Sequence, residues 1–162
     1  MGRLSTARLA ACIASALMIA ACGNAVIDAQ TAPAPTGGPL AITPEDPSLQ
    51  WGPCPDIFPA GCEIAVLHGN PAQANADVFL RVAGGYEIPA HSHTSAERML
   101  LARGELVVRY QGALETTLTA GQYAYGPAGL PHRARCASAT PCTLFIAFEG
   151  PVDAAAFAGS LD

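Results

Sequence analysis

Between residues 63 and 149 the sequence is a series of short apolar runs, each closed by glycine, proline or another turn residue. Runs of about four to eight residues bounded in this way are typical of β-strands. The runs expected to form strands are 63–67, 77–83, 97–103, 105–110, 113–119, 123–125, 132–137 and 143–149. Many short strands at near-even spacing favour an antiparallel sandwich or barrel. Residues 152–159 alone have a helical pattern, so the sequence predicts an all-β domain with a short C-terminal helix.

Three of the four histidines lie in two compact motifs. One residue separates His91 from His93, and Glu97 follows four positions later. Successive side chains of a strand alternate between its two faces, so His91 and His93 point the same way and Glu97 has the same parity. Two imidazoles and a carboxylate on one face form an open site of the kind that holds non-haem iron and related ions. His132 follows a turn rich in glycine and proline, which fixes its direction at the start of a strand.

These two motifs resemble those of the cupin family, the RmlC-like jelly-roll superfamily. The first family motif requires Gly, five residues, His-x-His, three or four residues, Glu, six residues and Gly. It is matched by Gly85, His91, His93, Glu97 and Gly104. The second requires Gly, five residues, Pro-x-Gly, two residues, His, three residues and Asn. It is matched by Gly121, Pro127, Gly129 and His132, whereas Cys136 occupies the position of the Asn.

The resemblance implies an antiparallel double-stranded β-helix, that is, a cupin or jelly-roll barrel, with one divalent transition metal inside. The implied ligands are His91, His93, Glu97 and His132. The Asn of the family motif is not a ligand, so Cys136 leaves the site intact. The ligand set accepts Mn, Fe, Ni, Zn or Cu and does not identify the ion. Three neutral imidazoles and one carboxylate leave a charge of +1, and a six-coordinate ion keeps two positions for water, an anionic substrate or dioxygen.

An apolar lining is expected around this site. Met99 and Leu101 share the parity of Glu97, and further candidates on facing strands are Phe79, Tyr123, Tyr125, Phe145 and Phe148. Core packing alone explains each of these side chains. His68 has no motif around it and is expected in a solvated turn.

The N-terminal residues 1–21 resemble a bacterial lipoprotein signal peptide. Arg3 and Arg8 precede and flank an uncharged run of 13 residues, 9–21, which falls short of the ~20 that span a bilayer. The run ends Ile-Ala-Ala before Cys22, the expected site of lipidation; cleavage without lipidation would instead release a secreted protein. Residues 22–50, rich in Pro, Ala and Gly, predict a flexible tether, 51–150 the cupin domain and 151–162 a C-terminal tail. The protein is therefore expected in the bacterial cell envelope, facing the periplasm or on the surface.

Four cysteines lie in the body of the exported chain, and an even number in an exported protein favours disulfides. They are Cys54, Cys62, Cys136 and Cys142, and four cysteines allow three pairings. The local pairs Cys54–Cys62 and Cys136–Cys142 are favoured because residues 136 and 142 fall on neighbouring strands of the last hairpin. Neither pair has the spacing of a zinc site, and buried free thiols are the alternative.

Charge argues against a nucleic-acid partner. Removal of residues 1–21 leaves six arginines, no lysine and 13 acidic residues, a formal charge of −7. Phosphate binding requires a cluster of basic side chains, which this chain lacks.

Three functions remain open. The first is a metal-dependent enzyme, an oxygenase, isomerase or lyase, that acts on a small organic substrate. The second is a non-catalytic module of the cell envelope that binds or senses a small ligand or the metal. The third is an interaction protein that uses the exterior of the barrel. The sequence does not fix the oligomeric state, although cupins often form homodimers.

Overall fold

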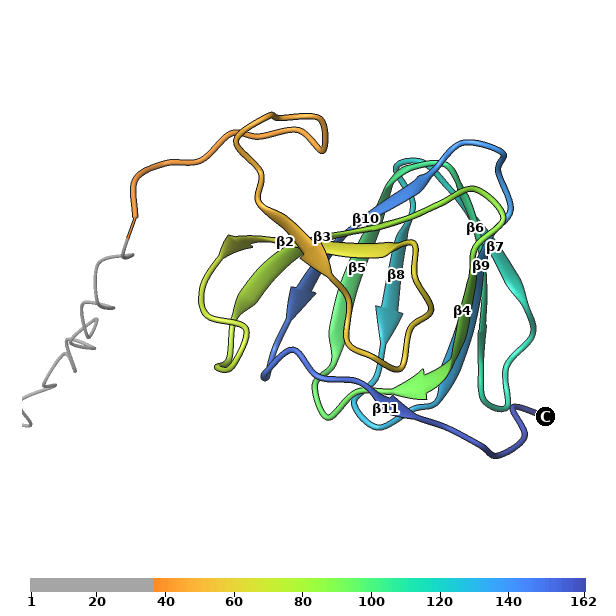
Figure 1. Ribbon diagram of the computed structural model, residues 1–162. Coiled ribbons are helices and arrows are strands. Elements are labelled where there is room, and N and C mark those ends of the chain that lie inside the picture. The colour runs from red at the N-terminus through yellow and green to blue at the C-terminus, as the bar shows by residue number, and fades with distance from the viewer. Residues whose placement is uncertain (1–36) are drawn as a thin grey trace, which may run out of the picture. The chain divides into compact units, whose positions relative to one another are not determined.

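The computed structural model describes residues 37–162 (Figure 1). The predicted signal peptide, Cys22 and most of the predicted tether lie outside these residues. Leu40–Asp162 form one compact unit. Within this unit the Glu45 carboxylate lies 2.7 Å from the Arg103 guanidinium, and this ion pair attaches the segment before the first strand to the barrel. The described residues contain no helix that could reach across a bilayer.

Residues 37–162 fold into eleven strands in two antiparallel sheets, and this confirms the predicted all-β jelly-roll fold (Figure 1). The six-stranded sheet has the order β1 (Trp51–Pro53), β2 (Cys62–His68), β3 (Ala76–Val82), β10 (Cys142–Phe148), β5 (Glu97–Arg103) and β8 (Tyr123–Gly126). The five-stranded sheet has the order β11 (Ala155–Ala156), β4 (Glu87–Ser92), β9 (His132–Cys136), β6 (Glu105–Tyr110) and β7 (Thr116–Thr119).

The core lies between the two sheets and follows the alternation of side chains along each strand. In β5, Met99 and Leu101 are buried, whereas Arg98 and Leu100, which alternate with them, are exposed. Strand β6 of the other sheet contributes Leu106 and Val108 to the same apolar cluster. A strand buries every second residue, so each sheet presents one apolar face to the other.

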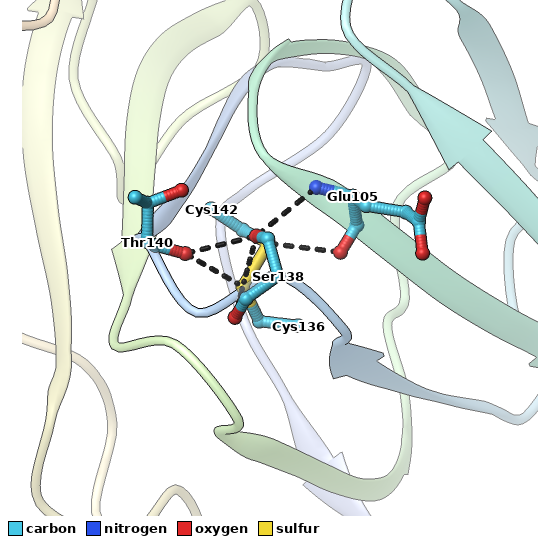
Figure 2. Close-up of a disulfide and its surroundings, with 5 residues drawn as sticks. All are labelled: Glu105, Cys136, Ser138, Thr140 and Cys142. Carbon is cyan, nitrogen blue, oxygen red and sulfur yellow. Dashed lines mark hydrogen bonds between the residues drawn. A yellow bond between two sulfur atoms is a disulfide. The ribbon is translucent and has the colours of Figure 1, made fainter.

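A disulfide ties the two sheets together at one end of the barrel. It joins Cys136, at the end of β9 in the five-stranded sheet, to Cys142, at the start of β10 in the six-stranded sheet. Figure 2 shows the polar groups around it: the Glu105 amide donates a hydrogen bond to Ser138 Oγ, which donates to the Thr140 carbonyl. The connection between β9 and β10 is thus held both covalently and by its own hydrogen bonds.

Gly104 allows this disulfide to pack against the turn between β5 and β6. Its φ of +85° lies in the left-handed region, and a Cβ there would approach Cys142 Sγ to 2.7 Å and Cys142 Cα to 3.0 Å. Glycine is the residue that meets both requirements, since it lacks a Cβ and adopts positive φ without strain. The positive φ and the close packing of Cys142 therefore explain why a glycine ends the first cupin motif.

Gly104→Ala is expected to lower the free energy of unfolding by about 2–4 kcal/mol, the sum of backbone strain and overpacking. Gly112→Ala is the matched control: Gly112 has a φ of +71°, but nothing lies within 4 Å of the added Cβ. The control should therefore lose only the ~1–2 kcal/mol of backbone strain. Urea unfolding of both variants measures the difference, and equal losses would show that contact with the disulfide does not matter.

The predicted C-terminal helix at residues 152–159 is wrong. Ala155 and Ala156 form strand β11, which pairs with Ser92 and His91 at the edge of β4. On either side of this strand, the Val152 amide donates to Pro71 O and the Phe157 amide to Ala90 O. An eight-residue helix is unstable by itself, whereas the edge of β4 offers unpaired backbone groups. The alanine-rich segment therefore adds to the sheet as an edge strand.

Candidate metal centre

The structure brings the four predicted ligand residues together from both sheets. His91 and His132 are cross-strand partners on β4 and β9, and Glu97 is the first residue of β5 in the opposite sheet. His93 lies in the loop that follows β4. The β4–β9 register shifts between Ile88 and His91, which turns both of these side chains toward the core although they are three residues apart. This irregularity aims His91 at the interior.

The distances between the ligand atoms suit a single ion. The ligand nitrogens of the three histidines all lie within 4.8 Å of one another. Glu97 Oε1 lies 3.4 Å from His93 Nε2, and Glu97 Oε2 lies 3.6 Å from His132 Nε2. Two ligands at ~2.1 Å from one ion and roughly 90–110° apart are separated by about 3.0–3.4 Å. The three histidines are therefore placed for joint coordination, and the Glu97 carboxylate lies beside two of them.

The backbone fixes the tautomer of each histidine. His91 Nδ1 lies 2.7 Å from Pro89 O, His132 Nδ1 lies 3.3 Å from Leu130 O, and His93 Nδ1 contacts Asp153 O. A carbonyl oxygen can only accept a hydrogen bond, so each Nδ1 carries the hydrogen and donates it. Each Nε2 then keeps its lone pair for a metal, and the carbonyl holds the ring in its orientation.

Burial sets the protonation of the site. Desolvation, reinforced by His132, lowers the pKa of His91 to about 3, and desolvation lowers the pKa of His132 to about 4 and also depresses that of His93. The histidines are therefore neutral, which is the form that binds metals. Desolvation raises the pKa of Glu97 to about 8, so its carboxylate requires a positive charge beside it to ionise readily at neutral pH.

Two polar atoms in the centre have no hydrogen-bond partner among residues 37–162. They are His93 Nε2 and Glu97 Oε2, and both are buried. A buried polar atom without a partner is costly, and native structures rarely leave one. A metal ion would take the lone pair of His93 Nε2, and its charge would stabilise the buried Glu97 carboxylate. The donor set and the tautomers therefore fit a divalent transition metal.

A small cavity adjoins the four ligands, with about 60 Å³ open to the centres of water-sized molecules. A bound water needs roughly 10–15 Å³ by this measure, so the space holds about four to six waters or a small ligand. Among the described residues that line it, none is Lys or Arg. The lining is chiefly apolar and comes from both sheets, including Ile64, Val78, Ile88, Met99, Val108 and Phe148.

The expected lining is only partly correct. Met99 and Phe148 line the cavity, and Leu101 is fully buried in the core. Tyr123 and Tyr125 instead lie on the outer side of β8, where 59% and 49% of each residue is exposed. Phe79 and Phe145 pack against each other at 6.4 Å and alternate along β3 and β10 with residues that line the cavity. All four point away from the site. The prediction failed for them because alternation defines two faces of a strand without identifying the inner one.

Two residues outside the motifs complete the centre. Phe58 lies in the loop between Cys54 and Cys62, which are joined by a disulfide, and its ring meets the His91 ring edge-on at 4.9 Å. Asp153 holds His93 through its backbone carbonyl and also accepts hydrogen bonds from the Thr94 amide and hydroxyl. No local pattern marks either residue, because Asp153 lies 60 positions from His93 and Phe58 reaches His91 only through the fold.

Replacing both Cys54 and Cys62 by alanine is expected to lower the free energy of unfolding by about 2–3 kcal/mol, because the unfolded chain regains the entropy of a short closed loop. Both cysteines and Phe58 line the cavity, so the same change should also loosen the cavity wall beside His91. Urea unfolding measures the first effect, and proteolytic nicking within residues 55–61 measures the second. A variant as stable and as resistant as the wild type would contradict both expectations.

Comparison with known proteins agrees with this architecture. Residues 42–153, more than half of the chain, match the family model described as the ChrR cupin-like domain. No curated protein sequence matches the chain. An RmlC-like cupin from Shewanella frigidimarina superposes with a TM-score of 0.53 at 23% identity, over 64% of this chain and 85% of that one.

Two similar structures belong to enzymes. The DMSP lyase DddQ from Ruegeria pomeroyi superposes with a TM-score of 0.58 at 19% identity, over 69% of this chain and 64% of the lyase. An oxalate oxidase superposes with a TM-score of 0.53 at 20% identity, over 61% of this chain and 56% of the oxidase. This chain thus spans less than two thirds of either enzyme, and at these identities the likeness concerns the fold. With two cupin motifs, a jelly-roll barrel and a family match over residues 42–153, the chain belongs to the ChrR cupin-like family.

Proposed function

We propose that this cupin binds one divalent transition metal through His91, His93, Glu97 and His132 and acts as a metal-dependent enzyme on a small organic molecule. One observation carries the proposal: three neutral histidines and a buried carboxylate converge beside a cavity of small-molecule size. A divalent ion held there would polarise a bound carbonyl or lower the pKa of a bound water. A lyase, oxygenase or isomerase reaction would use such chemistry, and two similar structures carry the names of a lyase and an oxidase.

The chain's own residues define what enters the cavity. Its apolar walls favour a compact substrate with a hydrocarbon body. A divalent metal held by three neutral histidines and one carboxylate keeps a single net positive charge. No Lys or Arg among the described lining residues adds to it. We therefore expect neutral compounds or monoanions to bind better than dianions.

A non-catalytic binding module is the second candidate. Among the described residues that line the cavity, the titratable groups are the four ligand residues and Asp153, whose carboxylate is engaged with Thr94. No separate general base is therefore evident there, and this favours ligand capture without turnover.

Metal-loaded protein and a panel of small metabolites distinguish the two candidates. Metal analysis should find one ion per chain, and incubation under oxygen with each of the loaded metals should give turnover of at least one compound. His132→Ala should remain folded and lose that turnover. Ligand binding without turnover for every metal would instead support the binding module, and a wild-type chain that retains no metal would overturn the proposal.

We also propose that the protein is exported and anchored to the envelope through a lipid on Cys22. The signal-like residues 1–21 and two disulfides support this location, since disulfides persist in oxidising compartments. Mass spectrometry of the protein from its native membrane fraction should find a lipidated Cys22 at the mature N-terminus. Cys22→Ser should release the protein into the soluble fraction, and a wild-type protein that is already soluble would contradict the anchor.

A further inference from the structure

One polar atom near the metal centre lies outside the four ligand residues and is equally isolated. The hydroxyl oxygen of Tyr110 is buried and, within residues 37–162, has no hydrogen-bond partner. Tyr110 is the last residue of β6 and the cross-strand partner of His132, and the two rings lie 5.0 Å apart. Buried tyrosine hydroxyls usually have a partner, so this hydroxyl and the unpartnered Glu97 Oε2 require a common explanation.

Both oxygens lie close to Gly126. It is the register partner of Glu97 on β8, and a Cβ at this position would lie 3.1 Å from Glu97 Oε2 and 3.2 Å from the Tyr110 hydroxyl oxygen. The backbone of Gly126 is not in the positive-φ region, so its conformation does not require glycine. Space is the remaining reason for glycine here: a larger residue would crowd both oxygens.

We propose that Tyr110 is a positioning residue for Glu97, whose Oε2 accepts a hydrogen bond from the Tyr110 hydroxyl directly or through one water in the gap beside Gly126. This inference rests on the proposed metal site. With Oε2 engaged in this way, Oε1, which lies 3.4 Å from His93 Nε2, is the oxygen directed to the metal. A tyrosine hydroxyl carries a hydrogen and can donate it. Partners of this type orient metal ligands and tune the affinity of the ion.

Cobalt titration of the metal-depleted full chain tests the role of Tyr110. Tyr110→Phe keeps the ring and removes only the hydroxyl, so the metal-free protein should unfold as the wild type does. Its affinity for Co²⁺ should fall about 10–100-fold, the usual cost of losing an outer partner of a metal ligand. The visible absorption bands of bound Co²⁺ should also shift, because the Glu97 carboxylate is no longer held in one orientation.

Gly126→Ala provides the second variant, because its methyl group would displace one of the two oxygens by a few tenths of an ångström. It should weaken Co²⁺ binding in the same direction. Tyr123→Phe and Gly52→Ala are the matched controls: Tyr123 is exposed, and nothing lies within 4 Å of a Cβ at Gly52. Both controls should bind Co²⁺ with wild-type affinity and spectrum.

The outcomes separate this inference from the proposed function. If the wild type binds Co²⁺ and Tyr110→Phe binds it with the same affinity and spectrum, the positioning role is overturned and the metal site stands. If the wild type itself binds no Co²⁺, the proposed metal site fails and the role of Tyr110 fails with it. A structural role alone would lower the stability of metal-free Tyr110→Phe and leave its Co²⁺ spectrum unchanged, which also overturns the proposal.

Discussion

Saturation with Zn²⁺ is expected to raise the unfolding temperature of the metal-depleted protein by at least about 10 °C. A ligand present at about 1,000 times its dissociation constant stabilises the folded state by ~4 kcal/mol, and each kcal/mol is worth roughly 3–5 °C for a domain of this size. The physical source is local: the ion binds His93 Nε2, which is buried without a partner in the described part of the chain, and its charge stabilises the buried Glu97 carboxylate. Differential scanning calorimetry with and without Zn²⁺ measures the shift.

Two histidine variants, one of a proposed ligand and one of His68 outside the site, test where Zn²⁺ binds. His91→Ala should lose most of the Zn²⁺-dependent shift, and its affinity should fall by more than the ~100-fold that an outer partner can cost, because a direct ligand is removed. His68→Ala removes an exposed histidine at the end of β2 and should keep the full shift. An equal shift in His91→Ala and the wild type would mean that Zn²⁺ binds elsewhere.

Most of the strands, although not β1, β4 and β11, and the grouping of the ligand residues could be predicted from the sequence because both depend on local spacing. Alternation of apolar residues in 97–103 corresponds to β5, whose buried positions are Glu97, Met99 and Leu101. The intervals between His91, His93 and Glu97 place the three side chains at the end of β4, in the loop after it and at the start of β5. His132 joins them because the turn before β9 aligns it with His91 across the five-stranded sheet.

Other features depend on contacts between distant segments, and spacing does not record these. Tyr123 and Tyr125 alternate as an inward-facing strand would, yet β8 is an edge strand of the six-stranded sheet and turns them outward. The outer partners of the ligands, such as Asp153 for His93, belong to remote segments that local patterns do not connect. The helical pattern of residues 152–159 gave the wrong structure for the same reason, since pairing with β4 outweighs the local preference of a short segment.

The second large effect concerns pH: the metal-free protein is expected to be most stable near pH 6.5. Below this pH the unfolded chain protonates histidines whose ordinary pKa is 6.5, whereas burial lowers the pKa of folded His91 and His132 to about 3 and about 4. The unfolded state therefore binds more protons, and stability falls as the pH falls from 6.5 toward 4. These two buried histidines outweigh the single carboxyl group of Glu97, which acts in the opposite direction over part of this range.

Above pH 6.5 the sign reverses because the effect of Glu97 exceeds that of the histidines, which lose their protons in the unfolded chain as well. Its carboxyl group has a pKa of about 8 in the folded state against an ordinary value of 4.5, so the folded state retains a proton that the unfolded chain has released. Stability should fall by about 1 kcal/mol between pH 6.5 and pH 8 and then level off, because the histidines of the unfolded chain still lose protons over the first part of this range. Urea unfolding of metal-free protein from pH 5 to pH 9 measures this profile.

Glu97→Gln identifies the group responsible. Glutamine does not ionise in this range, so the loss above pH 6.5 should disappear while the loss on the acidic side remains. Glu115→Gln, which replaces a half-exposed carboxylate that pairs with Arg133, should keep the wild-type profile.

A bound metal favours the ionised Glu97 carboxylate. The affinity of the protein for the metal should therefore increase with pH up to about 8, where Glu97 has lost its proton. If Glu97→Gln kept the decline in stability between pH 6.5 and pH 8, another group would have to be its source. A metal affinity that did not vary over this range would show that Glu97 does not bind the ion.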